Sequence, residues 1–391
     1  MDFTIHDDLA EHRAAAARWA EQHLRPEWVE LEHATGTHHN RELHRLLAEQ
    51  GLLAAGWPAE YGGSDVDVGY ADAVFEAIED FGLRMDGWVT TWMILNTVLR
   101  VGTEEQKRTI IPAGLRGEMV IVLGYTEPGA GSDMAAAQTR AVRDGDEWVI
   151  DGSKMFTSTA HEATHVFLLT RTNTAAAKHR GLTLFLVPLD APGVDIQPIH
   201  TLGGQRTNAT YYSGVRVPDA ARIGDVDGGW GVMRVAMVFE RRAKSGHGGL
   251  TMVDRLARWA RQAAGPDGRP LFEDTTVQEK LARMAVDEEV TRLLEQRTAW
   301  ITRGGGLSGV EGVMAKLYGS VSLQRQHEEM LDLIGPEAVL GASAPGAPMD
   351  GAPEFAFRNS VVETIYGGTS EILREIIAES RLGLPRSRPL T

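Results

Sequence analysis

Cysteine is absent from the 391-residue chain. Its absence excludes disulfides, thiolate metal sites and thiol nucleophiles, and it fits a reducing compartment, so we expect a cytoplasmic protein. Basic side chains are outnumbered, with 39 Lys and Arg against 54 Asp and Glu, and the formal net charge is -15. This balance disfavours a nucleic-acid partner or an acidic membrane surface. Apolar runs long enough for a membrane span and the layout of a signal peptide are also missing, so we expect no membrane insertion.

The hydrophobic pattern changes twice along the chain. It is helical up to about Val120, and it then turns into short apolar runs such as "THVFLLTRT" and "LTLFLVPL", which are typical of strands. Asp151 and Gly152 separate two of these runs and predict a hairpin. Helical spacing then returns and places Val232 to Val253 on one stripe of a long helix. We predict an α+β fold of three domains: an N-terminal helical domain (1–121), a middle β domain (122–228) and a C-terminal helical domain (229–391).

A glycine-rich stretch, "TEPGAGSD", follows the first predicted strand of the β domain and runs from Thr126 to Asp133. Its glycines, among them Gly131, allow a ligand to approach the backbone closely, and the hydroxyls of Thr126 and Ser132 flank them. The stretch matches neither a Walker loop nor a dinucleotide fingerprint. By itself such a stretch is more often an ordinary loop, so its context must decide.

The sequence "HEATH", His161 to His165, matches the zinc motif H-E-x-x-H. That motif binds zinc only on a helix, where the two histidines lie one turn apart. The flanking "KMFTST" and "VFLLT" are rich in strand-forming residues, so we expect the histidines at a strand end and predict no metal site.

Glu240 lies in "MVFERRAKSG" on the same predicted helix face as Ala236 and Ala243, so its carboxylate is expected to be partly buried. One interpretation is a rim carboxylate paired with Arg241 or Arg242. The other is a general base whose pKa is raised by desolvation and lowered by the neighbouring Arg.

The stretch "IYGGTSEILREII" places a paired glycine before a helix. Gly367 and Gly368 permit backbone angles or close approaches that other residues do not, and Thr369 begins a helix whose N-terminus favours anions. The alternative is a capped turn, with Tyr366, and likewise Phe156, serving as core residues.

Taken together, these stretches resemble the acyl-CoA dehydrogenase family over essentially the whole chain. "TEPGAGSD", "DGDEWVIDGSKMFTS", "VRVP" and "IYGGTSEILREII" occur in the order and spacing of that family, and "WPAEYGG" and "GTEEQK" agree more weakly. The resemblance implies a helical domain, a β-barrel or sandwich domain and a C-terminal four-helix bundle. It also implies FAD, held between the last two domains and shared across a tetramer interface.

The resemblance also bears on the catalytic base. Many members carry the catalytic Glu directly after the Tyr of the IYxGT motif, where this chain has Gly367. The long-chain and isovaleryl branches carry it on an earlier helix, just before an Arg, which corresponds to Glu240 and Arg241. The resemblance therefore implies Glu240 as the base, with the Gly367 backbone N–H holding the thioester oxygen.

Further site residues are carried over from the family in the same way. Phe156 stands where the family usually has a Trp beside the flavin ring, and Ser158 replaces a Thr near its reactive nitrogen. Ser132 is implied at the pyrophosphate or the thioester, and Arg241, Tyr366 and Gly367 at the substrate. The implied FAD contacts are Leu123, Tyr125, Thr126, Gly131, Ser132, Phe156 and Ser158, together with Thr369 and Glu371 on the FAD of a neighbouring subunit.

Two stretches depart from the family pattern. Ala264 and Asp267 replace an Arg and a Phe that grip FAD across the subunit interface, and Asp332 and Pro336 replace parts of a Gln-x-x-Gly-Gly stretch. An acidic group beside phosphates is repulsive. The half of the FAD site shared between subunits is therefore expected to be remodelled, weak or supplied by a different subunit.

The activity implied is α,β-dehydrogenation of an acyl thioester, carried on CoA or on an acyl-carrier protein, with electrons leaving to an electron-transfer flavoprotein. The assembly implied is a homotetramer or heterotetramer. Two alternatives remain open at this point: a flavin monooxygenase or oxidase of the same fold, and a non-catalytic subunit of a heteromeric dehydrogenase. The acyl group is not determined by these residues.

Overall fold

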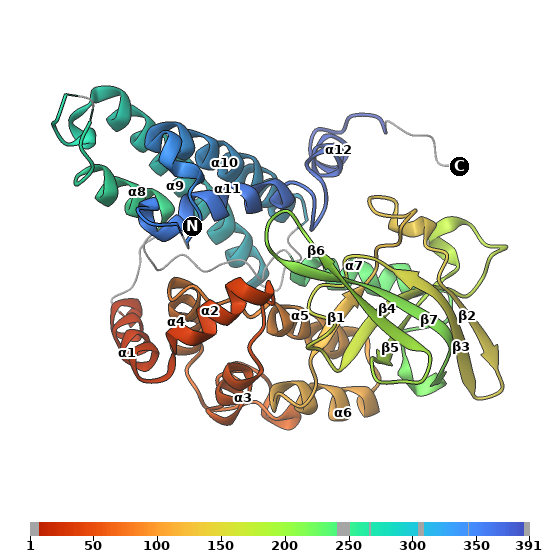
Figure 1. Cartoon of the computed structure of the whole chain (residues 1–391). Coiled ribbons are helices and arrows are strands. Elements are labelled where there is room, and N and C mark those ends of the chain that lie inside the picture. Colours follow the sequence, from red (N-terminus) through yellow and green to blue (C-terminus); the bar gives the residue numbers. More distant parts are fainter. Residues whose placement is uncertain (1–7, 241–250, 266, 304–308, 343, 387–391) are drawn as a thin grey trace. The chain divides into compact units, whose positions relative to one another are not determined.

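The computed structural model describes residues 8–240, 251–265, 267–303, 309–342 and 344–386 (Figure 1). These residues form two compact units, one made of the chain up to about residue 246 without 202–204, and one made of 202–204 with the rest of the chain. The predicted order of helices, then strands, then helices is confirmed.

The first unit contains helices and a sheet. Its helices are α1 (Asp8–His23), α2 (Pro26–Thr35), α3 (Arg41–Glu49), α4 (Val68–Asp80), α5 (Asp86–Val101), α6 (Glu104–Leu115) and α7 (Gly229–Glu240). Its strands are β1 (Ile121–Gly124), β2 (Arg140–Asp144), β3 (Glu147–Lys154), β4 (His165–Arg171), β5 (Leu182–Pro188), β6 (Val194–His200), β7 (Arg206–Pro218) and β8 (Arg222–Ile223).

Within the described residues the strands form one sheet in the order β6-β7-β3-β2-β4-β5-β8, and β1 pairs with β4. The β1 pairing with β4 and the single β2 pairing with β4 are parallel, whereas the other pairs are antiparallel. Because β1 and β2 follow one another along the same edge of β4, the loop between them leaves the sheet and returns to it. That loop carries "TEPGAGSD".

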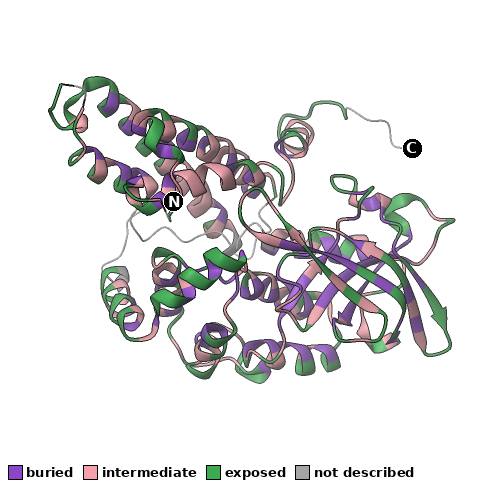
Figure 2. Cartoon of the chain, in the orientation of Figure 1, coloured by how far each residue is buried: buried purple, intermediate pink, exposed green. Residues whose placement is uncertain are grey.

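Strands β4 and β5 are buried on both faces, which explains their continuous apolar sequences (Figure 2). Phe167 and Leu169 belong to the core shared with the helices, and Val166 and Leu168 belong to the core on the opposite face. Helix α7 contributes to the first of these cores through its buried residues, Val232, Met233, Ala236 and Phe239. The sheet therefore holds the end of α7, and with it Glu240, on the first unit.

The predicted hairpin at Asp151 and Gly152 is wrong. Strand β3 runs through both residues, and its pairing with β7 shifts by a bulge between Ile150 and Gly152. Gly152 has φ 148°, and a Cβ there would lie 2.7 Å from the Cα of Thr139, so only glycine fits. The reversal of the chain occurs earlier, between β2 and β3.

The second unit is helical in its described part and has its own core. Its helices are α8 (Met252–Ala260), α9 (Thr275–Arg303), α10 (Val310–Ile334), α11 (Ala352–Glu363) and α12 (Ser370–Ser380). The predicted continuous helix from Val232 to Val253 is wrong, because Thr251 is extended and caps a new helix, α8, through the N–H of Asp254. Capping by a threonine hydroxyl at this point favours a fresh helix start over continuation.

Candidate functional site

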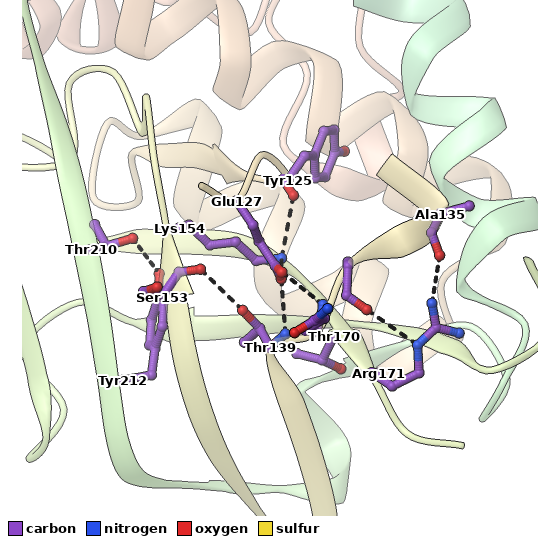
Figure 3. A network of polar contacts seen from close by, with 12 residues as sticks. Tyr125, Glu127, Ala135, Thr139, Ser153, Lys154, Thr170, Arg171, Thr210 and Tyr212 are labelled. Atoms are coloured by element: carbon purple, nitrogen blue, oxygen red, sulfur yellow. Dashed lines mark hydrogen bonds and ion pairs between the residues drawn. The ribbon is translucent and has the colours of Figure 1, made fainter. Parts of the chain in front are cut away.

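Two segments predicted from separate motifs lie side by side in the first unit. They are the loop after β1 and the turn after β3 (Figure 3). The N–H of Met155 donates to the carbonyl of Thr126 at 2.8 Å, and the Lys154 ammonium donates to the carbonyl of Tyr125 at 3.3 Å. The structure thus brings together the predicted residues of both segments, from Leu123 to Ser132 and from Phe156 to Ser158.

A buried ion pair holds the two segments. The Lys154 side chain is fully buried, and its Nζ lies 2.7 Å from Oε1 of Glu127. Glu127 also accepts hydrogen bonds from the backbone N–H groups of Gln138 and Thr139, at 2.7 and 2.8 Å. Burial raises the pKa of Glu127, but Lys154 and the two N–H donors outweigh it, so the pKa is lowered overall. Burial lowers the pKa of Lys154 to about 8, against the attraction of Glu127, so the pair is charged at neutral pH.

Arg171 secures the end of the loop on β4. Its guanidinium donates to the carbonyls of Ala137 at 3.2 Å, Ala135 at 2.5 Å and Lys178 at 2.8 Å. A guanidinium has five fixed donors, so one buried side chain can satisfy several carbonyls at once. The segment after Ser132 is therefore fixed at both ends, whereas Gly131 and Ser132 themselves are exposed.

Phe156 is held outward by its backbone. Its φ is 60°, which is uncommon for a residue with a side chain, and its exposed fraction is 58%. Next to it, Ser158 is exposed and its Oγ lies 3.0 Å from Oγ1 of Thr207. This surface therefore suits a planar aromatic ligand with polar groups. It combines the open ring of Phe156, the exposed hydroxyls of Ser132 and Ser158, and Gly131, which has free space where a Cβ would lie.

The second unit holds the paired glycines. Gly367 and Gly368 have φ 64° and 99°. Both therefore adopt the left-handed backbone conformation that the paired glycines predicted for this turn. Thr369 caps α12 by accepting the N–H of Ile372 at 3.3 Å. The Oγ of Ser370 is buried and has no hydrogen-bond partner among the described residues. A capped helix start with an unsatisfied hydroxyl fits a polar or anionic ligand group.

The side chains on either side of this turn are exposed. The ring of Tyr366 is 36% exposed, and the Lys316 ammonium lies 4.4 Å from its centroid. Lys316 in turn donates to the carbonyl of Glu363 at 2.6 Å. The Glu371 side chain is 80% exposed on α12. Tyr366 is thus a surface residue and not part of the core, which was the alternative for it and for Phe156.

Glu240 is the last residue of α7, and its side chain and all of Arg241 lie outside the described residues. The helix before it is well packed, because Ala236 is fully buried and Phe239 is 5% exposed. The Phe239 ring meets the ring of Trp92 on α5 edge-on, with centroids 6.0 Å apart. The prediction that Glu240 is the base stays a prediction.

The two divergent stretches form ordinary local structure in the second unit. Asp267 accepts the N–H of Arg269 at 3.0 Å and its Nε at 2.8 Å, so it closes a turn in which Ala264 pairs with Pro270. Pro336 opens a short 3-10 helix just after α10, and Asp332 is exposed on the last turn of α10. These local contacts account for the residues of both stretches without the need for a bound ligand.

"HEATH" does not form a helix. His161 and Glu162 lie in a turn and His165 begins β4, as the flanking strand-forming residues predicted. His161 bonds to Thr37 and Asn208 instead of a partner histidine.

Sequence reasoning missed the residues that hold the site together, Glu127, Lys154 and Arg171. A signal was available for one of them, because Lys154 is the only cation in the sequence of β3 and ends that strand. A charged residue at such a position is buried only when it is paired.

Family models match the chain in three consecutive parts. The acyl-CoA dehydrogenase N-terminal domain matches residues 6–118, the middle domain 122–215 and the C-terminal domain 227–382. The chain belongs to the acyl-CoA dehydrogenase family. The resemblance and the fold class predicted from sequence are confirmed, whereas the predicted domain boundaries stay a prediction.

Known relatives match this chain in sequence and fold along nearly its whole length. Acyl-CoA dehydrogenase FadE26 of Mycobacterium tuberculosis is 36% identical over 358 residues, 89% of this chain and 88% of the relative. The solved structure of the Tcur3481-Tcur3483 steroid ACAD is 35% identical, with a TM-score of 0.89 over 99% of this chain and 100% of that one. The ChsE4-ChsE5 complex from Mycobacterium tuberculosis is 33% identical, with a TM-score of 0.86 over 99% and 100%.

The protein is therefore an oxidoreductase of the acyl-CoA dehydrogenase type, and FAD is the cofactor of the family. The residues present fit a flavin. In the first unit, the open ring of Phe156 and the accessible Gly131 suit a planar ring system with polar groups. In the second unit, taken by itself, the unsatisfied Ser370 hydroxyl suits a polar ligand group. No helix in the described part of this acyl-CoA dehydrogenase is long and apolar enough to cross a bilayer.

Proposed function

We propose that this acyl-CoA dehydrogenase introduces an α,β double bond into an acyl thioester, with Glu240 as the base that removes the α-proton. FAD, when bound, accepts the β-hydrogen as hydride. The Gly367 backbone N–H donates to the thioester oxygen, which makes the α-proton more acidic as charge develops on that oxygen. A base needs to approach within about 2.6 to 3.2 Å of the group it deprotonates, and α7 is the element that delivers the carboxylate.

One observation carries the proposal: in a chain of this family, an exposed aromatic ring stands beside a glycine-rich loop that a buried ion pair holds in place. Phe156 would face the flavin ring, with Leu123, Tyr125 and Thr126 along the loop and Ser158 next to Phe156. Gly131 and Ser132 would contact the polar part of the cofactor. Thr369 and Glu371 would contact the FAD of a neighbouring subunit, and Arg241 and Tyr366 would contact the substrate.

We further propose a steroid acyl-CoA as the substrate class, since the solved steroid ACAD is 35% identical over nearly the full length of both chains. An electron-transfer flavoprotein would take the electrons. An anaerobic panel of straight-chain, branched and steroid thioesters, followed through flavin bleaching, tests the substrate class. Fastest bleaching by a straight-chain thioester would overturn the steroid assignment and leave the dehydrogenation itself standing.

The variant Glu240→Gln tests the base. Gln has nearly the same size but cannot accept the α-proton, so turnover should fall by about two to four orders of magnitude. Flavin content and its visible spectrum should stay as in the unaltered protein, which separates a lost base from a lost cofactor. Turnover within a factor of two of the unaltered protein would refute the assignment.

We propose a heteromeric assembly with a second chain of the same family. Asp267 bonds to Arg269 of its own turn, at the position where the family has a Phe that contacts FAD across the subunit interface. In addition, two similar solved structures are named as pairs of chains, Tcur3481-Tcur3483 and ChsE4-ChsE5. Purification of the chain alone and with a co-expressed partner tests this. A yellow, fully flavin-loaded homomer would refute it, and a chain that never binds flavin in either preparation would favour the non-catalytic subunit.

A further inference from the structure

The turn between β3 and β4 is fixed by one asparagine of β7. Asn208 is fully buried, and its Nδ2 donates to the carbonyl of Thr157 at 3.0 Å. The N–H of Thr157 donates back to the carbonyl of Asn208 at 2.9 Å. Thr157 lies between Phe156 and Ser158, so this reciprocal pair sets the position of both exposed side chains.

The contact with Asn208 favours one neutral tautomer of His161. The Nδ2 of Asn208 has two hydrogens, and after Thr157 the second one points at Nδ1 of His161, 3.2 Å away. Because an amide nitrogen only donates, Nδ1 must accept, and the neutral ring carries its hydrogen on Nε2. That N–H donates to Oγ1 of Thr37 at 2.9 Å, in the segment before α3. The "HEATH" histidine thus connects the helical part of the unit to the turn.

The surroundings disfavour a charged ring. Arg41 on α3 donates to the carbonyl of His161 at 3.3 Å and also pairs with Glu162. Among the described residues, Arg206 on β7 and His39 before α3 also act electrostatically on His161 or are acted on by it. Burial lowers the pKa of His161 most, and Arg206 and Arg41 lower it further, whereas Glu162 and the hydrogen bond with Asn208 act in the opposite direction without reversing the shift. Protonation at Nδ1 would place an N–H against the N–H of Asn208 and break that contact.

We propose that His161 is a positioning residue for the flavin: its neutral Nε2–H form holds Asn208, and Asn208 holds the turn that presents Phe156 and Ser158. Protonation of His161 releases the turn and changes the surroundings of the flavin. This inference rests on the proposed function for the contact of Phe156 and Ser158 with FAD. It gives a role to a motif that the zinc interpretation leaves unexplained.

The test is a pH titration of the visible flavin spectrum in the FAD-loaded protein, with its partner chain if one is required. The unaltered protein should show a spectral transition on acidification, at a pH below the ordinary value of 6.5 for histidine. His161→Asn keeps an acceptor for Asn208 and cannot titrate, so it should keep the neutral-pH spectrum and lose the transition. His161→Leu should show the acid spectrum at every pH and bind FAD about 2- to 10-fold more weakly, as for one lost hydrogen bond.

The matched control is His165→Asn. His165 is in the same motif and is also partly buried, but its ring bonds only to the neighbouring Thr164 among the described contacts. This variant should titrate like the unaltered protein. A transition that persists in His161→Asn, a His161→Leu spectrum equal to that of the unaltered protein, or no transition in the unaltered protein would each overturn the proposal.

A second measurement separates this proposal from the proposed function. Nitrogen NMR of the full chain labelled with ¹⁵N-histidine, assigned by comparison with His161→Asn, reports the tautomer of His161 without any turnover. The Nε2–H form is expected, and an Nδ1–H form would overturn the argument from Asn208. A protein that shows the expected tautomer but neither binds FAD nor oxidises a thioester would instead refute the proposed function.

Discussion

Replacing Lys154 by Met should destabilise the first unit strongly. The ammonium is fully buried and lies 2.7 Å from Oε1 of Glu127, which is only 8% exposed. Removing one partner leaves an uncompensated carboxylate in a dry site, and breaking such pairs costs about 3 to 5 kcal/mol. For a unit of this size that corresponds to a fall in melting temperature of about 6 to 20 °C.

Two further variants test whether this destabilisation arises because the ion pair is buried. Lys178→Met removes an ion pair with Asp133 in the same region and at the same 2.7 Å, but the two side chains are 57% and 47% exposed. Exposed pairs are worth about 0 to 1 kcal/mol, so this control should melt nearly as the unaltered protein does. The double variant Glu127→Gln with Lys154→Met removes both charges of this pair and should recover much of the loss.

Differential scanning calorimetry of the four proteins at pH 7 measures these effects, because the two units can melt as separate transitions. Flavin retention should fall with Lys154→Met as well, since the loop after β1 and the turn after β3 lose their common anchor. Equal melting temperatures for Lys154→Met and Lys178→Met would refute the reasoning. A double variant less stable than Lys154→Met would show that the pair contributes through packing and not through charge.

The remaining predictions concern pH and the subunit interface. Burial lowers the pKa of His44 to about 4, so between pH 6.5 and 4 only the unfolded chain takes up a proton there and stability falls as the pH falls. His44→Leu should therefore reduce the loss of unfolding free energy between pH 7 and 5 by about 2 kcal/mol in urea titrations, and an unchanged difference would contradict this. Restoring Arg and Phe at Ala264 and Asp267 should tighten FAD if the interface has the family layout, and unchanged flavin retention would mean that it is built differently.

The sequence by itself determined the features that depend on neighbouring residues. The strands β4 and β5, the cap of α12 at Thr369 and the left-handed Gly367 all follow from local composition and spacing. The same holds for "HEATH", whose flanking residues ruled out a helix. Family membership also followed from sequence, because ordered motifs survive where individual residues change.

Tertiary structure alone decided which distant residues meet. Glu127 and Lys154 are 27 residues apart, and His161 and Asn208 are 47 apart. The contact of His161 with Asn208 depends on the register of β3 against β7, and Gly152 changes that register through a bulge that sequence reasoning took for a hairpin. A single-residue shift in a strand moves every side chain to the other face, so no local pattern specifies such contacts. The buried ion pair that anchors the loop after β1 is a property of the fold for this reason.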